Sequence, residues 1–371
     1  MKGAAMTSTP WLALLRRHQV WRPRPLRWVL QDMTGLARQP EQAHRTHLRA
    51  TLEWLCRAQD ANRSAPGSVV AGWTFESGWL PGNVEVAGRL IETCLPAADY
   101  LAWPELRHRA RSMLDTLLVQ PDTPSAGHLQ GLIAGHLQLA HPESLARAVS
   151  CGQALREAPA HTAGQHVHAA HALARLAPLS GVAAFREAAH RQLDAALAQQ
   201  TPCGWFADVR QPTPMSTLAG ITRGLIESAH LLDEPRALRA GRQVAQAMCD
   251  RLDGAGWLAG AYDDGWTPAA VHACVPGLAQ LAGAWLRLAQ MGEGAHWHDA
   301  AWRALAWIKR TQRTMGDDLA LRDALPSAVP IWRGPDAFRF DAMSAKYFSD
   351  ALMMDMVGIA IPPVAQKAES A

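Results

Sequence analysis

Residues 126–140 read AGHLQGLIAGHLQLA and place three glycines, Gly127, Gly131 and Gly135, at intervals of four. Residues four apart lie on one side of an α-helix, and glycine is otherwise a poor helix residue. A glycine ladder of this kind lets the helix backbone approach a neighbour very closely, because no Cβ atoms intervene. The stretch therefore predicts an inner helix of a crowded ring.

The same 3.6-residue periodicity extends along the chain on both sides of this stretch. No run alternates with a period of two for long enough to suggest a sheet. Gly- and Pro-rich loops separate the periodic segments. The twelve predicted helices are 42–60, 84–98, 103–119, 126–140, 142–157, 163–178, 181–200, 215–232, 234–253, 269–291, 295–313 and 340–357.

These helices alternate in character. Odd-numbered ones are rich in Arg, Glu and Gln, whereas even-numbered ones are richer in Gly, Ala, Ser and His. The unit is a hairpin of about 50 residues, and about six of them fit the chain. A stacked solenoid is the rival architecture, but the loops before the even helices are long and uneven. We therefore predict an all-α fold, an (α/α)6 toroid of about twelve helices.

Charge divides the chain. Residues 1–50 carry nine Lys/Arg and two Asp/Glu, so the rest carries 27 basic and 31 acidic side chains. Residues 51–371 are therefore not expected to bind nucleic acid. The basic head is a candidate contact for a membrane surface or a protein partner, although an outer strap or a solvated tail is the simpler interpretation. The expected divisions are a basic appendage (1–40), the toroid (41–360) and a disordered tail (361–371).

Compartment and cofactors follow from what the sequence lacks. No segment approaches the ~20 apolar residues of a membrane span, and no signal peptide is recognisable, which favours a cytoplasmic location. The six cysteines show no CxxC and read as free thiols. His272 and Cys274 point to opposite sides of a helix, so no metal and no cofactor is expected. Of the histidines at 161–171, only His168 and His171 share a face, which is typical of polar lining.

The toroid has a consequence for function. Long loops precede the even helices and would therefore gather at one mouth of the ring. Glycoside hydrolysis needs a pair of carboxyl groups, and Glu85 with Asp263 or Asp264 could supply it across that mouth. Helix capping by Glu85 and a turn role for Asp263–Gly265 are the structural alternatives.

Other residues near the mouth are candidates for binding a sugar. Indole rings stack on sugar faces, although loop tryptophans also serve as anchors. In the twelfth helix, the apolar stripe through Met343 and Tyr347 is expected to face the outer ring, and Lys346 is expected to pair with Asp350 or with a carboxylate at the mouth. The predicted substrate-binding residues are Trp79, His128, Trp205, Trp266, His272, Arg339, Asp341 and Lys346.

Scattered motifs carry a family resemblance over about residues 45–357. They are Trp54–Asp60, Gly78-Trp79, Glu85–Gly88, Gly204–Phe206, Arg223–Glu227, Asp264–Trp266, Cys274–Gly277 with Gln280, Trp285–Leu288 and Ala345–Asp350. Together they resemble a bacterial family of uncharacterised α/α toroid proteins. That family is similar in fold to terpenoid cyclases and protein prenyltransferases and is associated with exopolysaccharide-biosynthesis genes.

The resemblance implies a carbohydrate-active protein that binds an oligosaccharide or lipid-linked glycan in its central cavity and cleaves or modifies it. A hydrolase, lyase or epimerase-like activity would fit. The sequence departs from the family pattern at three positions, because Ser68, His128 and Pro276 stand where the family has other residues. A non-catalytic glycan-binding or scaffold subunit is therefore an alternative. A terpenoid or prenyl enzyme is a weaker alternative, because Asp263-Asp264 lacks the first acidic residue of an Asp-x-Asp-Asp acid motif.

Overall fold

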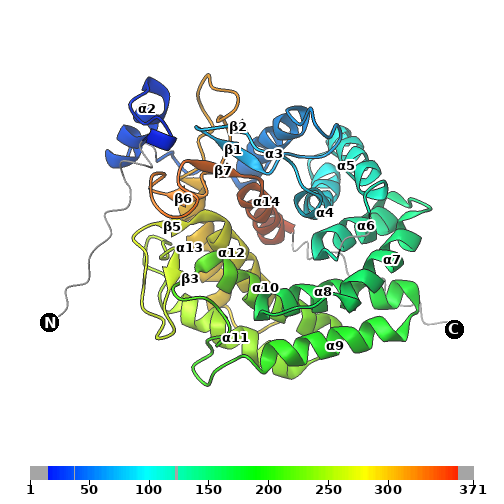
Figure 1. The fold of residues 1–371 in the computed structure, drawn as a ribbon. Helices are drawn as coiled ribbons and strands as arrows, with labels where there is room; N and C mark the ends of the chain where they lie inside the picture. The colour runs from blue at the N-terminus through cyan, green and yellow to red at the C-terminus, as the bar shows by residue number, and fades with distance from the viewer. Residues whose placement is uncertain (1–15, 37, 122–123, 358–371) are drawn as a thin grey trace.

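A computed structural model describes residues 16–36, 38–121 and 124–357. Within them, six inner helices form a closed ring in which each contacts the next and the last contacts the first (Figure 1). The inner helices are α4 (Val84–Tyr100), α6 (Ala126–Leu139), α8 (Ala163–Ser180), α10 (Met215–Leu232), α12 (Val275–Gln290) and α14 (Ala342–Val357). The chain is an (α/α)6 toroid, as predicted.

Six outer helices cover the inner ring. Five of them pack on the inner helix that precedes them in sequence, and the first packs on α14, so that helices from the two ends of the toroid lie side by side. The outer helices are α3 (His44–Asp60), α5 (Pro104–Leu118), α7 (Ser144–Glu157), α9 (Ala183–Leu197), α11 (Pro235–Cys249) and α13 (His296–Lys309). All twelve predicted helices are present; their ends differ from the prediction by a few residues, most at the start of α12.

The glycine ladder has the predicted role. A Cβ added at Gly131 would lie 2.6 Å from the Cα atom of Gly88 in α4, and one at Gly88 would lie 2.0 Å from the carbonyl oxygen of Gly127. Such distances are impossible for real Cβ atoms, so only glycine allows the two backbones to come this close. This contact joins α4 and α6 on the inner ring.

Short strands tie the long loops together. β3 (Thr213–Pro214) pairs with β4 (Ala261–Tyr262), and β5 (Ala273–Cys274) pairs with β6 (Ala328–Val329). β7 (Arg339–Asp341) pairs with β1 (Gly72–Thr74), which pairs in turn with β2 (Gly78–Trp79). Each ladder between loops joins the segments before two neighbouring inner helices. The long loops therefore gather at one end of the ring, as expected.

The basic N-terminal segment, where it is described, packs on this loop end. It contains α2 (Pro23–Met33), which was not predicted. The Arg313 guanidinium lies 3.3 Å from the Trp28 ring centroid, and the Trp28 and Phe340 rings are 4.9 Å apart. The segment is thus an outer strap. The tail expected at 361–371 lies outside the described residues.

Within the described residues, no helix is long and apolar enough to cross a membrane.

Candidate functional site

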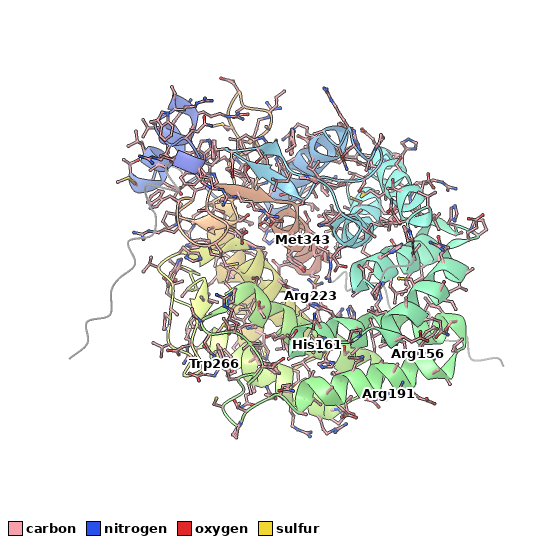
Figure 2. All side chains as sticks on the ribbon, in the orientation of Figure 1. Arg156, His161, Arg191, Arg223, Trp266 and Met343 are labelled. Carbon is pink, nitrogen blue, oxygen red and sulfur yellow. The ribbon has the colours of Figure 1, made fainter. Side chains whose placement is uncertain are left out.

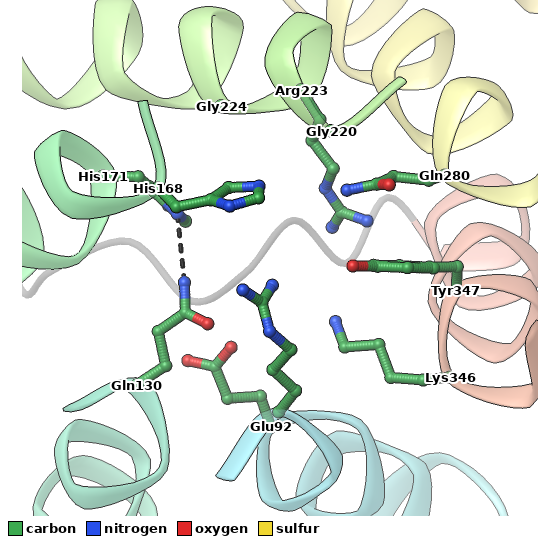
Figure 3. Close-up of a pocket in the computed structure, with 11 residues that line it drawn as sticks. Glu92, Gln130, His168, His171, Gly220, Arg223, Gly224, Gln280, Lys346 and Tyr347 are labelled. Atoms are coloured by element: carbon green, nitrogen blue, oxygen red, sulfur yellow. Dashed lines mark hydrogen bonds between the residues drawn. The ribbon is translucent and has the colours of Figure 1, made fainter. Parts of the chain in front are cut away.

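Polar side chains from all six inner helices converge on a cavity inside the ring, here called the deep cavity (Figure 3). It encloses about 390 Å³ of space not filled by atoms, including the part open to solvent. Its lining residues are Arg89, Glu92, Gln130, His168, His171, Gly220, Arg223, Gly224, Gln280, Lys346 and Tyr347. Gly220 leaves room there because it carries no side chain: a Cβ added to it would lie 3.3 Å from the His168 ring and 3.8 Å from the Gln280 amide.

Cationic groups enter the deep cavity from α4, α10 and α14. Arg89 pairs with Glu85 at 2.6 Å, and Lys346 forms an ion pair with Asp350. The guanidinium of Arg223 points toward the middle of the ring (Figure 2) and lies 3.7 Å from the Asp350 carboxylate. Of the two partners predicted for Lys346, Asp350 or a carboxylate at the mouth, the structure shows Asp350.

Arg223 is the least satisfied of these cations. Its side chain is almost fully buried, and its Nη1 atom makes no hydrogen bond to any described residue. The nearest carboxylates, Asp350 at 3.7 Å and Glu227 at 4.0 Å, are too far for hydrogen bonds. A buried guanidinium with an unused donor is costly unless something binds it. The deep cavity thus offers a donor for an anionic or hydroxylated ligand.

The acidic groups around the deep cavity are engaged by cations. Glu92 forms an ion pair with Arg175, and Glu227 pairs with Arg287 at 3.0 Å. The hydroxyl of Thr93 donates a hydrogen bond of 2.7 Å to Asp350. These carboxylates therefore balance arginines and lysine, and they leave the cavity without an excess of negative charge.

Two histidines line the opposite wall, as the sequence indicated for His168 and His171. Burial and the nearby Arg89 lower the pKa of His168 to about 4, and burial with Arg175 and Arg223 lowers the pKa of His171 as well. Both rings are therefore neutral at pH 7. Gln130 lies within hydrogen-bond distance of His171, at 3.2 Å.

A second hollow, the mouth cavity, adjoins the deep cavity and shares Arg89 and His168 with it. It encloses about 1090 Å³ by the same measure. Its walls are Asn83, Val84, Glu85, Arg89, Pro124, Ser125, Ala126, Leu155, Ala158, Pro159, Ala160, Gln165, His168, Ala169 and Gln192. Most of these residues stand at the N-terminal ends of α4, α6 and α8, so this cavity opens at the loop end.

Glu85 lines the mouth cavity and pairs with Arg89, which lines both cavities. Its carboxylate accepts hydrogen bonds from the Ser125 hydroxyl and from the backbone N–H of Gly127, so it caps the start of α6. Burial alone would raise the pKa of Glu85, but Arg89 and these hydrogen bonds lower it below its ordinary value. The side chain is therefore an ionised carboxylate at neutral pH, with its oxygens engaged by Arg89, Ser125 and Gly127.

Asp263 and Asp264 line neither cavity. The Asp263 carboxylate accepts hydrogen bonds from the backbone N–H groups of Gly265 (3.0 Å) and Thr267 (2.8 Å), which is the turn role anticipated as an alternative. Asp264 is exposed. The structure does not bring either residue into a cavity with Glu85.

The three predicted tryptophans are anchored in the loops. Trp205 and Trp266 are buried and meet edge to face, with ring centroids 4.8 Å apart. Trp79 is partly buried, with its ring 5.9 Å from that of Trp54. None of the three lines either cavity.

Two predicted histidines face elsewhere than the cavities. His128 is fully buried and faces the outer layer. Its Nε2 atom lies 3.2 Å from the carbonyl oxygen of Leu117 in the outer helix α5. His272 packs so closely on the loops that a Cβ at Gly260 or Gly334 would meet its ring. Burial lowers the pKa of His272.

The start of α14 holds the remaining predicted residues. Arg339 pairs with Asp341 at 3.2 Å, and Asp341 accepts the backbone N–H of Met343 at the first turn of the helix. Burial raises the pKa of Asp341. The expectation that Tyr347 faces the outer ring is wrong: Tyr347 lies beside Lys346 in the deep cavity (Figure 3). The helix turns its polar side and this tyrosine inward together.

Sequence reasoning did not single out most of the cavity residues. Arg89, Glu92, Arg223 and Gln280 were passed over as site residues, although a signal existed. Polar side chains recur at i, i+3 and i+4 within otherwise small and apolar inner helices, as in Arg89 and Glu92 of α4. Since buried charges are rare without a partner, such recurrences mark the face toward the cavity. Among residues that the structure describes, no group of three His, Cys, Asp or Glu side chains is placed to hold a metal ion.

Comparisons agree with the architecture. No protein-family model and no curated protein sequence matches the chain. Among solved structures, the unsaturated glucuronyl hydrolase of Bacillus sp. GL1 matches with a TM-score of 0.69 at 11% identity, covering 84% of this chain and 96% of that one. The enzyme of Streptococcus agalactiae gives 0.67 at 11% identity, covering 85% and 92%. One specific for heparin gives 0.67 at 11%, covering 83% and 95%. At this identity the likeness shows a shared α/α toroid fold.

Proposed function

We propose that this protein is carbohydrate-active and takes the acidic end of a glycan into its deep cavity. The observation that carries the proposal is the buried Arg223 guanidinium, whose Nη1 lacks a hydrogen-bond partner among the described residues. A uronic acid carboxylate would supply the missing acceptor, because guanidinium and carboxylate match in charge and in planar geometry. Gln130, Gln280 and the neutral histidines are suited to bind the sugar hydroxyls.

The solved neighbours point in the same direction. The Bacillus enzyme is described as responsible for the degradation of glycosaminoglycan, and one Streptococcus structure holds dGlcA-GalNAc6S. Ligands of this class combine a sugar ring with a carboxylate. The transfer of that ligand class to this chain is our proposal, and it rests on the charged lining rather than on sequence identity.

The proposal is tested by calorimetry with uronic-acid disaccharides, saturated and unsaturated, against their neutral counterparts. The acidic sugars should bind, and Arg223→Gln should weaken binding at least about tenfold, because a buried charge-assisted contact is lost. Arg191→Gln is the matched control, since Arg191 lies exposed on the outer helix α9. Equal affinity for acidic and neutral sugars, or equal loss in both variants, would contradict an acidic-sugar site.

Cleavage or modification of the bound glycan is a second proposal, in which Glu85 is the base or nucleophile. Its ionised carboxylate lines the mouth cavity, beside Arg89, which lines both cavities. Asp263 and Asp264 remain proposed partners only through their place at the loop end. Glu85→Gln should abolish turnover while binding persists; turnover that survives in this variant would remove Glu85 from the mechanism.

A scaffold without catalysis is the alternative, and it predicts binding without turnover in the wild-type protein. A terpenoid or prenyl substrate fits less well, because an apolar chain would leave the buried Nη1 donor of Arg223 without a hydrogen-bond partner. We also propose a cytoplasmic role beside exopolysaccharide assembly, with an oligosaccharide or lipid-linked glycan as ligand and a partner at the basic N-terminal segment. Recovery of the native protein in a periplasmic fraction would contradict that location.

A further inference from the structure

The outward side of α2 carries a row of exposed apolar side chains. Leu26, Leu30 and Met33 are 39%, 50% and 67% exposed and follow one another at i, i+4 and i+7. In a helix this spacing forms one continuous stripe. Trp21 and Leu36, also exposed, extend the apolar surface beyond the two ends of the helix. Leu26, Leu30 and Met33 are called the α2 stripe below.

The opposite side of α2 is fixed to the toroid. Trp28 is covered by the Arg313 guanidinium and meets Phe340 edge to face, and the backbone N–H of Ile331 donates a 2.7 Å hydrogen bond to Asp32. Leu30 lies on the reverse of the face that holds Trp28 and Asp32, by helical geometry. The α2 stripe is therefore held away from the body, and the helix cannot turn it inward without losing these contacts.

Unpaired positive charge surrounds the stripe. Arg17 and Arg24 are engaged by Glu76 and Asp318. In contrast, Arg16, Arg22 and Arg27 are exposed and form no ion pair with any described residue. Arg22 stands one turn before Leu26, and Arg27 flanks Leu30. An apolar stripe bordered by free arginines matches a surface that is apolar inside and anionic outside.

We infer that α2 docks on an anionic lipid bilayer, lying in the interface with the α2 stripe inserted among the acyl chains and the free arginines on the headgroups. Amphipathic helices with basic borders bind membranes in this way, and anionic lipid strengthens the binding. Nucleic acid would use the arginines but would leave the stripe in water. The inference is independent of the glycan proposal, because none of these residues lines either cavity.

The test is co-sedimentation of the full chain with vesicles of phosphatidylcholine alone or mixed with phosphatidylglycerol. Binding should be at least about tenfold stronger with phosphatidylglycerol and should fall as salt rises. The double variant Leu30→Ser/Met33→Ser should lose at least about tenfold, since two inserted side chains are removed. The double variant Arg22→Gln/Arg27→Gln should lose about tenfold on anionic vesicles only.

The control is Val119→Ser/Val271→Ser, which removes two exposed apolar side chains (79% and 72%) from other parts of the surface. It should bind like the wild-type protein, and circular dichroism should show equal helix content in every variant. Absence of binding to phosphatidylglycerol vesicles overturns the inference, as does equal loss in the control. If the stripe variant instead converts a dimer to a monomer in light scattering and wild-type protein ignores vesicles, the stripe is a contact between copies and the inference is wrong.

Discussion

Two neutral histidines stand beside buried arginines in the deep cavity, and this placement makes the fold sensitive to acid. The folded-state pKa of His168 is about 4, whereas its ordinary value is 6.5. Between those values the unfolded chain binds more protons than the folded chain. Stability is therefore complete above the unfolded pKa and falls as the pH drops from 6.5 toward 4.

His168→Gln should remove much of this acid sensitivity. In the wild-type protein the contribution lost across that range is on the order of 3 kcal/mol. Urea unfolding at neutral pH and at mildly acidic pH measures it, with His108→Gln on the exposed side of α5 as the control. His108→Gln should lose stability on acidification as steeply as the wild-type protein. If His168→Gln loses it as steeply too, the protonation of His168 is not responsible.

Lys346, Asp350 and Arg223 form a buried charge cluster that a double-mutant cycle can dissect. Asp350→Asn should cost about 3 kcal/mol of stability, because it leaves Lys346 and Arg223 without their shared carboxylate. Lys346→Met should cost less, since Asp350 keeps Thr93 and Arg223 nearby. The double variant should be more stable than the sum of the single losses predicts, by about 1–3 kcal/mol. Additive losses would mean that the pair does not interact.

At the scale of the element, α6 is specified by its closest contact rather than by helix propensity. An alanine at Gly131 would place its Cβ against the Gly88 backbone and the Leu117 side chain. In an exposed helix the same change would add about 1 kcal/mol of stability. In α6 we expect Gly131→Ala to cost about 2 kcal/mol or more by overpacking.

Gly164→Ala in α8 is the matched control, because a Cβ there would make only ordinary contacts at 3.9 Å. It should leave the free energy of unfolding unchanged or slightly raised. Thermal denaturation of both variants decides the question. A Gly131→Ala protein as stable as the wild type would mean that α4 and α6 do not approach as closely as the structure has them.

At the scale of the whole molecule, the toroid is closed by contacts between its two ends. Phe348 of α14 is fully buried and lies with its ring 6.2 Å from that of His47 in α3, about 300 residues away in sequence. In a closed ring every hairpin has two neighbours, so no end can fray by itself, unlike the terminal repeats of an open solenoid. We therefore expect one cooperative unfolding transition.

Phe348→Ala at the closure and Phe185→Ala in α9, another fully buried ring, test this expectation. Each should lower the midpoint of the same single transition, at a cost of about 3–5 kcal/mol. Calorimetry compares the measured enthalpy with the van't Hoff enthalpy. A second transition that appears only in Phe348→Ala would show that the ends unfold separately and that ring closure adds no cooperativity.

The sequence by itself determined the helices and their order in the ring. Periodicity is a local property, so the positions of all twelve helices could be read without knowing what they pack against. The Gly127, Gly131 and Gly135 ladder also predicted a close contact between helix backbones, because glycine at this spacing has few other uses in a helix. The alternation of polar and small helices then indicated which layer each helix occupies.

Only the tertiary structure decided which side chains meet inside the ring. Arg89, Arg223 and Lys346 are separated by more than a hundred residues each, and they converge because ring closure sets the rotation of each inner helix. A rotation of one residue moves a side chain by about 100° around the axis, beyond what a periodic pattern can resolve. For this reason Tyr347 faces the cavity and His128 faces the outer layer, which the sequence alone did not reveal.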